Sequence, residues 1–153
     1  MKGSRLLRIG VVIAALVAIV AATTLEAGAY GRTEFGVGLP ISTSFSLSYV
    51  NLALEVYGRI LLGALAWETA LQTNLGFASL YVRNTLATTG RFFLALGHVT
   101  GLLPSFGSTY FTFGAGILLG QTFLVRAAVN LALSIGGGFF PFLELRLQFG
   151  LDP

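Results

Sequence analysis

The fold is decided by residues 122–150, which read TFLVRAAVNLALSIGGGFFPFLELRLQFG. The stretch is apolar enough for a membrane helix, yet it contains Arg126, Glu144 and Arg146. Its residues alternate with the period of two that is typical of a strand, instead of the helical period of about 3.6. In residues 122–135 one face is apolar: Phe123, Val125, Ala127, Val129, Leu131, Leu133 and Ile135. The other face is mostly small or polar: Thr122, Leu124, Arg126, Ala128, Asn130, Ala132 and Ser134.

The same alternation continues after the glycine run 136–138, which predicts a turn between two strands. The apolar face of the second strand is Leu143, Leu145, Leu147, Phe149 and Leu151. Its opposite face is Glu144, Arg146, Gln148 and Gly150. A hairpin centred on the glycine run sets Asn130 opposite Glu144. The same register sets Ala128 opposite Arg146, so the charged residues share the face of the small ones.

Alternation of this kind extends upstream through most of the chain. It is found in TYFTFGAGILL (109–119), RFFLALGHVTG (91–101), ILLGALAWETAL (60–71) and SFSLSY (44–49). The phase flips near Val50, where we expect a bulge or a turn. One apolar face and one small or polar face, repeated over the chain, is the pattern of a closed transmembrane β-barrel. Closure follows because an open sheet edge in hydrocarbon leaves backbone amides and carbonyls unpaired.

Break signals divide the chain into eight strands. The breaks are Leu39-Pro40, Tyr57-Gly58, Thr73-Asn74, 88–90, 104–107, Gly120-Gln121 and 136–138. The expected strands are 31–38, 42–56, 59–72, 75–84, 91–101, 109–119, 121–135 and 140–150. The sequence therefore predicts an all-β, antiparallel, up-and-down transmembrane barrel with a filled interior. Because the mean hydropathy is +0.84, a small α-helical membrane protein remains the architectural alternative.

The first 29 residues have the pattern of an export signal. A basic start, MKGSRLLR, precedes the apolar run IGVVIAALVAIV, and small residues follow at VAA (20–22) and AGA (27–29). We expect a signal peptide helix over residues 1–29, cleaved after Ala22 or Ala29, and a barrel domain over 30–153. An uncleaved transmembrane anchor is the alternative, although the apolar run is shorter than the ~20 residues of a spanning helix.

The composition excludes several classes of function. Residues 30–153 contain six arginines and five acidic residues, so no basic surface points to nucleic acid. The chain has no cysteine and one histidine, which argues against disulfides, thiolate chemistry and a zinc site. We expect no metal and no cofactor.

Over residues 30–151, the chain resembles the small eight-stranded outer-membrane barrels of Gram-negative-type bacteria, the OmpA/OmpX class. The resemblance rests on the export signal, the strand count and the alternation, and not on a diagnostic motif. It departs from the class at its end, LQFGLDP (147–153), since members usually end in an aromatic residue, and it lacks their long polar loops. The resemblance implies the bacterial outer membrane, contact with membrane lipids, and a structural or interaction role in the envelope with an unidentified protein partner.

Four charged residues are predicted to meet inside the barrel: Glu68, Arg126, Glu144 and Arg146. Buried charges are tolerated when they are paired and hydrogen-bonded, so we expect a network that plugs the lumen. The alternative is a narrow channel lined by the same residues.

His98 and Thr100 are separated by one residue, Val99, and therefore share one face of the predicted strand. The pair faintly resembles the arrangement of outer-membrane lipid A deacylase barrels, in which a histidine, a serine and a glutamate act together. Here Thr100 stands in place of the serine, and no outward glutamate is identifiable as the third member. A lipid-modifying enzyme that uses His98 is therefore an alternative, and a structural histidine at the membrane interface is the favoured interpretation.

Five aromatic residues fall mostly near predicted strand ends: Tyr49, Tyr57, Trp67, Tyr81 and Tyr110. Aromatic rings near strand ends are typical of the girdles that barrels place at the headgroup level. We predict such a girdle, with a ligand-stacking site as the alternative.

Overall fold

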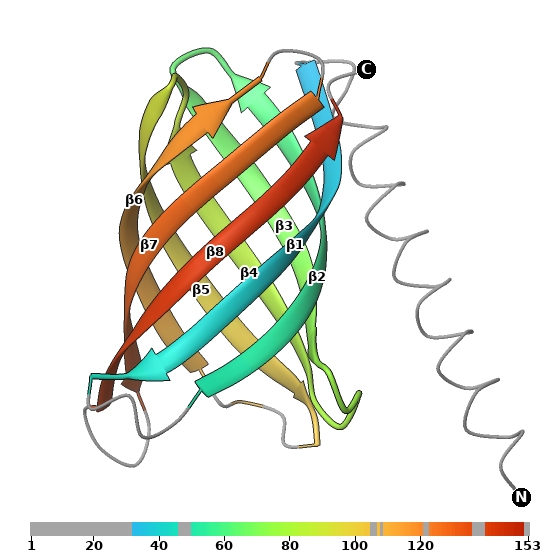
Figure 1. Ribbon diagram of the computed structural model, residues 1–153, viewed down its shortest axis with the longest axis vertical. Helices are drawn as coiled ribbons and strands as arrows, with labels where there is room; N and C mark the ends of the chain where they lie inside the picture. Colours follow the sequence, from blue (N-terminus) through green and yellow to red (C-terminus); the bar gives the residue numbers. More distant parts are fainter. Residues whose placement is uncertain are drawn as a thin grey trace, which may run out of the picture.

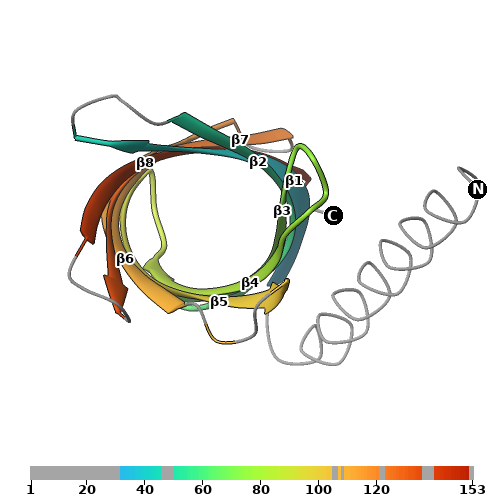
Figure 2. The same cartoon turned by 90° about the horizontal axis from the view of Figure 1, so that it is seen from below.

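The computed structural model describes residues 32–45, 50–104, 107, 109–120, 123–135 and 140–151. These residues form one closed antiparallel sheet of eight strands, in which each strand pairs with its neighbours in the chain and β1 pairs with β8 (Figures 1 and 2). The strands are β1 (Arg32–Ser44), β2 (Val50–Leu62), β3 (Leu65–Asn74), β4 (Leu80–Thr88), β5 (Phe92–Leu103), β6 (Thr109–Leu119), β7 (Phe123–Ile135) and β8 (Phe140–Leu151). The predicted all-β, eight-stranded, up-and-down barrel is confirmed.

The described residues are strands and their connections, so the α-helical alternative is wrong for this part of the chain. No helix long and apolar enough to cross a membrane is found among the described residues. The predicted signal peptide, with its cleavage sites at Ala22 and Ala29, lies outside them.

Two predicted breaks in the first half are wrong, because Pro40 lies inside β1 and Gly58 inside β2. Proline has no backbone N–H, and the pairing of β1 with β2 passes from Gly38 to Ile41 without a change of register. Gly58 is buried between its neighbours on β1 and β3. The true connections fall later in the sequence. The strand expected at 42–56 is β2 (Val50–Leu62), and the strand expected at 75–84 is β4 (Leu80–Thr88).

The phase flip near Val50 marks a real connection, since β1 ends at Ser44 and β2 begins at Val50. The next connection is the two-residue turn Gly63-Ala64. Gly63 has φ of 66°, a left-handed conformation that glycine adopts without steric cost. A two-residue turn of this kind suits the twist of a tight hairpin.

The last hairpin has the predicted register. Asn130 pairs with Glu144 and Ala128 pairs with Arg146 in the ladder between β7 and β8. Side chains alternate between the interior and the outer surface along each strand. The charged and small residues of this hairpin therefore lie on its interior face, and its leucines lie on the outer face.

Glycine keeps the narrow interior free for long side chains. A Cβ built on Gly38 would lie 2.6 Å from Cγ of Glu55, and one built on Gly36 would lie 2.7 Å from the Tyr57 ring. Real Cβ atoms essentially never approach so closely. These positions on β1 therefore accommodate side chains that come from β2.

The start of β1 and the end of β8 lie at the same end of the barrel (Figure 1). The connections at that end cover residues 63–64, 89–91 and 120–122. The connections at the opposite end cover residues 45–49, 75–79, 104–108 and 136–139 and are somewhat longer.

Candidate functional site

The interior of the barrel is an ion-pair network. All four glutamates of the described residues are buried there with four arginines: Glu34, Glu55, Glu68, Glu144, Arg59, Arg83, Arg126 and Arg146. Four negative and four positive groups balance in number. Burial of charge is tolerated in this form because each ion has an opposite partner in a site from which water is largely excluded.

One part of the network joins β4, β7 and β8. Arg83 binds Glu144 through both terminal nitrogens, and the Nη1 to Oε1 distance is 2.7 Å. Asn130 donates from Nδ2 to Oε1 of Glu144 over 3.0 Å. A two-point contact between a guanidinium and a carboxylate fixes the geometry of both groups, so this cluster sets how the strands meet across the lumen.

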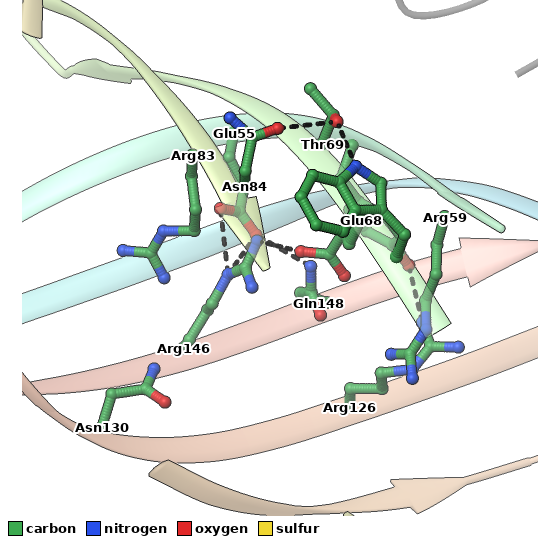
Figure 3. Close-up of polar contacts among 12 residues, drawn as sticks. Glu55, Arg59, Glu68, Thr69, Arg83, Asn84, Arg126, Asn130, Arg146 and Gln148 are labelled. Atoms are coloured by element: carbon green, nitrogen blue, oxygen red, sulfur yellow. Dashed lines mark hydrogen bonds and ion pairs between the residues drawn. The ribbon is translucent and has the colours of Figure 1, made fainter. Parts of the chain in front are cut away.

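A second part is centred on Arg146 of β8. Its Nε donates to Oε1 of Glu55 at 2.8 Å, and its Nη2 contacts Oε1 of Glu68 at 2.5 Å. Gln148 donates to the same oxygen of Glu55 over 3.1 Å. Figure 3 shows the guanidinium of Arg146 among these side chains. One arginine of β8 thereby joins glutamates from β2 and β3.

A third part involves β1, β2 and β7. Arg126 pairs with Glu34 and also donates to the hydroxyl of Tyr57 over 3.2 Å. Arg59 is held more weakly, because its Nε lies 4.0 Å from Glu34. Its guanidinium also lies over the ring of Phe93, 5.8 Å from the centroid, a distance at which a cation–π attraction operates.

The interior is almost full. The cavity that remains is lined by Arg59, Arg83, Thr85 and their neighbours. Its volume is about 10 Å³, roughly the space of one water molecule. Three buried atoms at this cavity have no hydrogen-bond partner in the described part: Nε of Arg59, Nε of Arg83 and Oγ1 of Thr85.

The structure places all four residues of the predicted lumen network in the interior. It brings Glu68 and Arg146 into direct contact, whereas Arg126 pairs with Glu34 and Glu144 pairs with Arg83. Sequence reasoning missed the interior partners Glu34, Glu55, Arg59 and Arg83. The signal was present in VNLALEVYGRILL (50–62), where the polar residues share one phase, but the misplaced break at Gly58 concealed it.

The predicted aromatic girdle is placed only in part on the outer surface. Trp67 lies on the outer face of β3 and is 43% exposed. Tyr57 is 0% exposed in the interior, so the prediction of an outer position is wrong for this residue. Tyr81 and Tyr110 share the phase of interior neighbours and are half-buried. Tyr49 lies outside the described residues.

His98 and Thr100 both point outward from β5 and are half-buried. His98 lies in the middle of β5 and not near a strand end, where an interfacial histidine was expected. The ring of His98 lies 4.8 Å from that of Phe111, centroid to centroid. In the ladder between β4 and β5, His98 pairs with Asn84. Because every glutamate of the described residues is interior, the structure provides no carboxylate on this face to orient His98.

A short chain of polar side chains lies next to His98 on the outer surface. Trp67 donates from Nε1 to the hydroxyl of Thr69 over 3.3 Å, and Thr69 donates to Oδ1 of Asn84 over 3.0 Å. Figure 3 shows Thr69 and Asn84 on neighbouring strands. We name Thr69, Asn84, His98 and Thr100 the outer polar stripe.

No group of three or more metal-ligating side chains is found within the described ranges. Comparison with known proteins gives no family, since no family model and no curated protein matches the chain. The class of the molecule therefore follows from its fold and site alone. It is a small, closed, eight-stranded antiparallel β-barrel with a charged, filled interior and an apolar outer surface.

Proposed function

We propose that this protein is a small outer-membrane β-barrel that acts as a structural or interaction component of the bacterial envelope. The observation that carries the proposal is the inverted polarity of the barrel: eight of the ten charged side chains among the described residues are buried inside, and most of its large apolar side chains are exposed outside. This distribution is opposite to that of a water-soluble domain, in which charged residues are almost never fully buried and apolar side chains form the core.

The outer surface supports the choice of a lipid environment. Exposed leucine, valine and phenylalanine side chains lie on all eight strands, as Val37, Leu54, Leu65, Leu86, Leu96, Phe113, Val129 and Leu145 illustrate. Soluble monomers rarely expose contiguous apolar patches beyond a few hundred Å². A band of this kind around a closed barrel is the surface that hydrocarbon stabilises.

The interior supports a structural role over transport. Eight strands enclose a lumen just wide enough for side chains to fill. Here the ion pairs of Arg83, Arg126 and Arg146 occupy that lumen, and about one water molecule fits in the cavity that remains. We therefore expect a barrel that is closed to ions.

The proposal is tested by expressing the full chain in a Gram-negative host and separating its membranes. The expected result is a protein in the outer-membrane fraction that floats with liposomes after purification. Unheated, it migrates on gels at a different position from the boiled sample. Recovery from the soluble fraction, without flotation, would overturn the proposal.

Two measurements address the alternatives of a channel and a lipid-modifying enzyme. In planar bilayers we expect no stepwise conductance, and regular openings would favour the channel. Replacing His98 by Ala should leave the acylation of lipid A in the host membrane unchanged. A change in that acylation, observed with the wild-type chain and lost in H98A, would favour the enzyme.

A further inference from the structure

Polar side chains on the outer surface are concentrated on one side of the barrel. The outward positions of β3, β4 and β5 include Thr69, Thr73, Asn84, Thr88, His98 and Thr100. The described outward side chains of β2, β7 and β8 are apolar, apart from the buried Gly58, and those of β6 are apolar from Phe111 to Leu119. On β1 the outward polar residues are Thr33 and Thr43, each next to an end of the strand. Away from the strand ends, the described outward polar side chains therefore lie on β3, β4 and β5.

The stripe has hydrogen-bonding capacity that the barrel itself does not use. Oδ1 of Asn84 accepts from Thr69, but the amide nitrogen of Asn84 donates to no group among the described residues. Within the same residues, His98 makes a ring contact with Phe111 and no side-chain hydrogen bond. A neutral imidazole offers one donor and one acceptor, and the free amide nitrogen offers two donors.

The position of the stripe makes this unused capacity costly. Asn84 lies in the middle of β4 and His98 in the middle of β5. In the proposed membrane these groups face hydrocarbon at depth, where no water is present to accept or donate. Polar side chains at such positions stabilise association by hydrogen bonding across the contact between two membrane segments.

We propose that the outer polar stripe is the contact surface for a second copy of this chain. The two copies are related by a twofold axis that runs between β4 and β5, so that the Asn84 amide of each barrel donates to the His98 ring of the other. This inference rests on the proposed membrane insertion.

Two properties of the surface favour a second copy as the occupant. The stripe contains no acidic residue, lysine or arginine and offers both donors and acceptors, so it is complementary to itself, as a twofold interface requires. It also covers three adjacent strands, and the exposed side chains of Leu86, Leu94 and Leu96 flank it. These leucines supply apolar packing around the hydrogen-bonded centre.

The absence of cysteine from the chain allows a direct test by cross-linking. Leu96→Cys places a thiol beside the stripe, and Val129→Cys places a matched thiol on β7, since the native side chains are 56% and 58% exposed. Both full-length variants are reconstituted in liposomes at a low ratio of protein to lipid and treated with a short bismaleimide. We expect Leu96→Cys to give a covalent dimer and Val129→Cys to give none.

The interface itself is tested in the Leu96→Cys background by replacing Asn84 and His98 with leucine. The double replacement makes the outer face more apolar, so the barrel should still float and keep its heat-modifiable mobility, while the cross-linked dimer is lost. Equal cross-linking of both cysteine variants, or of the leucine variant, would overturn the proposal. So would a folded, floating Leu96→Cys barrel that gives no dimer, and this result leaves the membrane proposal intact. Failure to float contradicts the membrane proposal and this inference together.

Discussion

The inner and outer faces of β8 show how one strand serves two environments. Glu144 and Arg146 on the inner face are buried and ion-paired, while Leu145 on the outer face, between them in sequence, is exposed. In a soluble sheet the apolar face would be covered by other parts of the protein. Here the protein covers its charges and exposes its leucines, so the two faces contribute to stability in different ways.

The interior provides little apolar packing to hold the barrel together. Its cluster of buried apolar side chains consists of Ala87, Phe93 and Ala128, with Ala95 packed against it. Specific contacts across the lumen therefore come from ion pairs, whose geometry is exact but whose net energy is small compared with their desolvation. The outer face contributes through burial in its surroundings, which is large but non-directional. We expect the inner face to be sensitive to single substitutions and the outer face to respond mainly to polarity.

The largest effect is expected from Glu144→Leu. This substitution removes both contacts of Arg83 and leaves a fully buried guanidinium unpaired, which costs about 3–5 kcal/mol of unfolding free energy. Urea unfolding followed by the fluorescence of Trp67, the single tryptophan, measures the loss. Replacing Arg83 by Met in the same chain removes the stranded charge and should restore most of the stability. A double variant as unstable as the single one would contradict the role assigned to the pair.

A charge on the outer face should have the next largest effect. The proposed membrane insertion predicts that Val129→Arg, in the middle of β7, costs about 2–4 kcal/mol in a bilayer. Leu119→Arg is the matched control, because Leu119 is the last residue of β6 and 45% exposed, and near the interface the cost falls to about 0–1 kcal/mol. Equal costs for the two variants would mean that the outer face does not cross a membrane.

Much of the barrel was predictable from periodicity, because the phase of a strand fixes which side chains point inward. The last hairpin was placed in the correct register because its glycine run defines a centre of symmetry, which then pairs Asn130 with Glu144. The first half was harder to divide. Pro40 and Gly58 resemble breaks in sequence, yet they lie within strands where the pairing tolerates them.

The partners across the lumen could not be predicted in this way. Arg83 and Glu144 are 61 residues apart and come from strands that are not neighbours in the sheet. Their meeting depends on the tilt and stagger of the closed barrel, which no single hairpin reveals. Phase alone shows that Arg83 points inward, whereas its choice of partner is a property of the whole fold.

An intermediate effect is expected when the interior is made more crowded. A Cβ at Gly114 would lie 2.9 Å from Cα of Asn130 and closer still to the side-chain oxygen of the same residue. Overpacking of this kind costs about 1–3 kcal/mol, so Gly114→Ala should lower the urea midpoint. Gly76→Ala is the control, because nothing lies within 4 Å of its added methyl group. Equal midpoints for the two variants would show that the interior can relax around Gly114.

The smallest effect separates the outer polar stripe from the rest of the outer face. Thr69→Val removes the hydroxyl that links Trp67 to Asn84, and side-chain hydrogen bonds in a membrane contribute about 0.6 kcal/mol on average. Thr100→Val is the matched control, since within the described residues Thr100 makes no side-chain hydrogen bond and points outward from β5. Measured on monomeric barrels in detergent, only Thr69→Val should lose stability. Equal losses in the two variants would mean that the stability depends on a threonine hydroxyl at the outer face in general, and not on the Thr69–Asn84 contact.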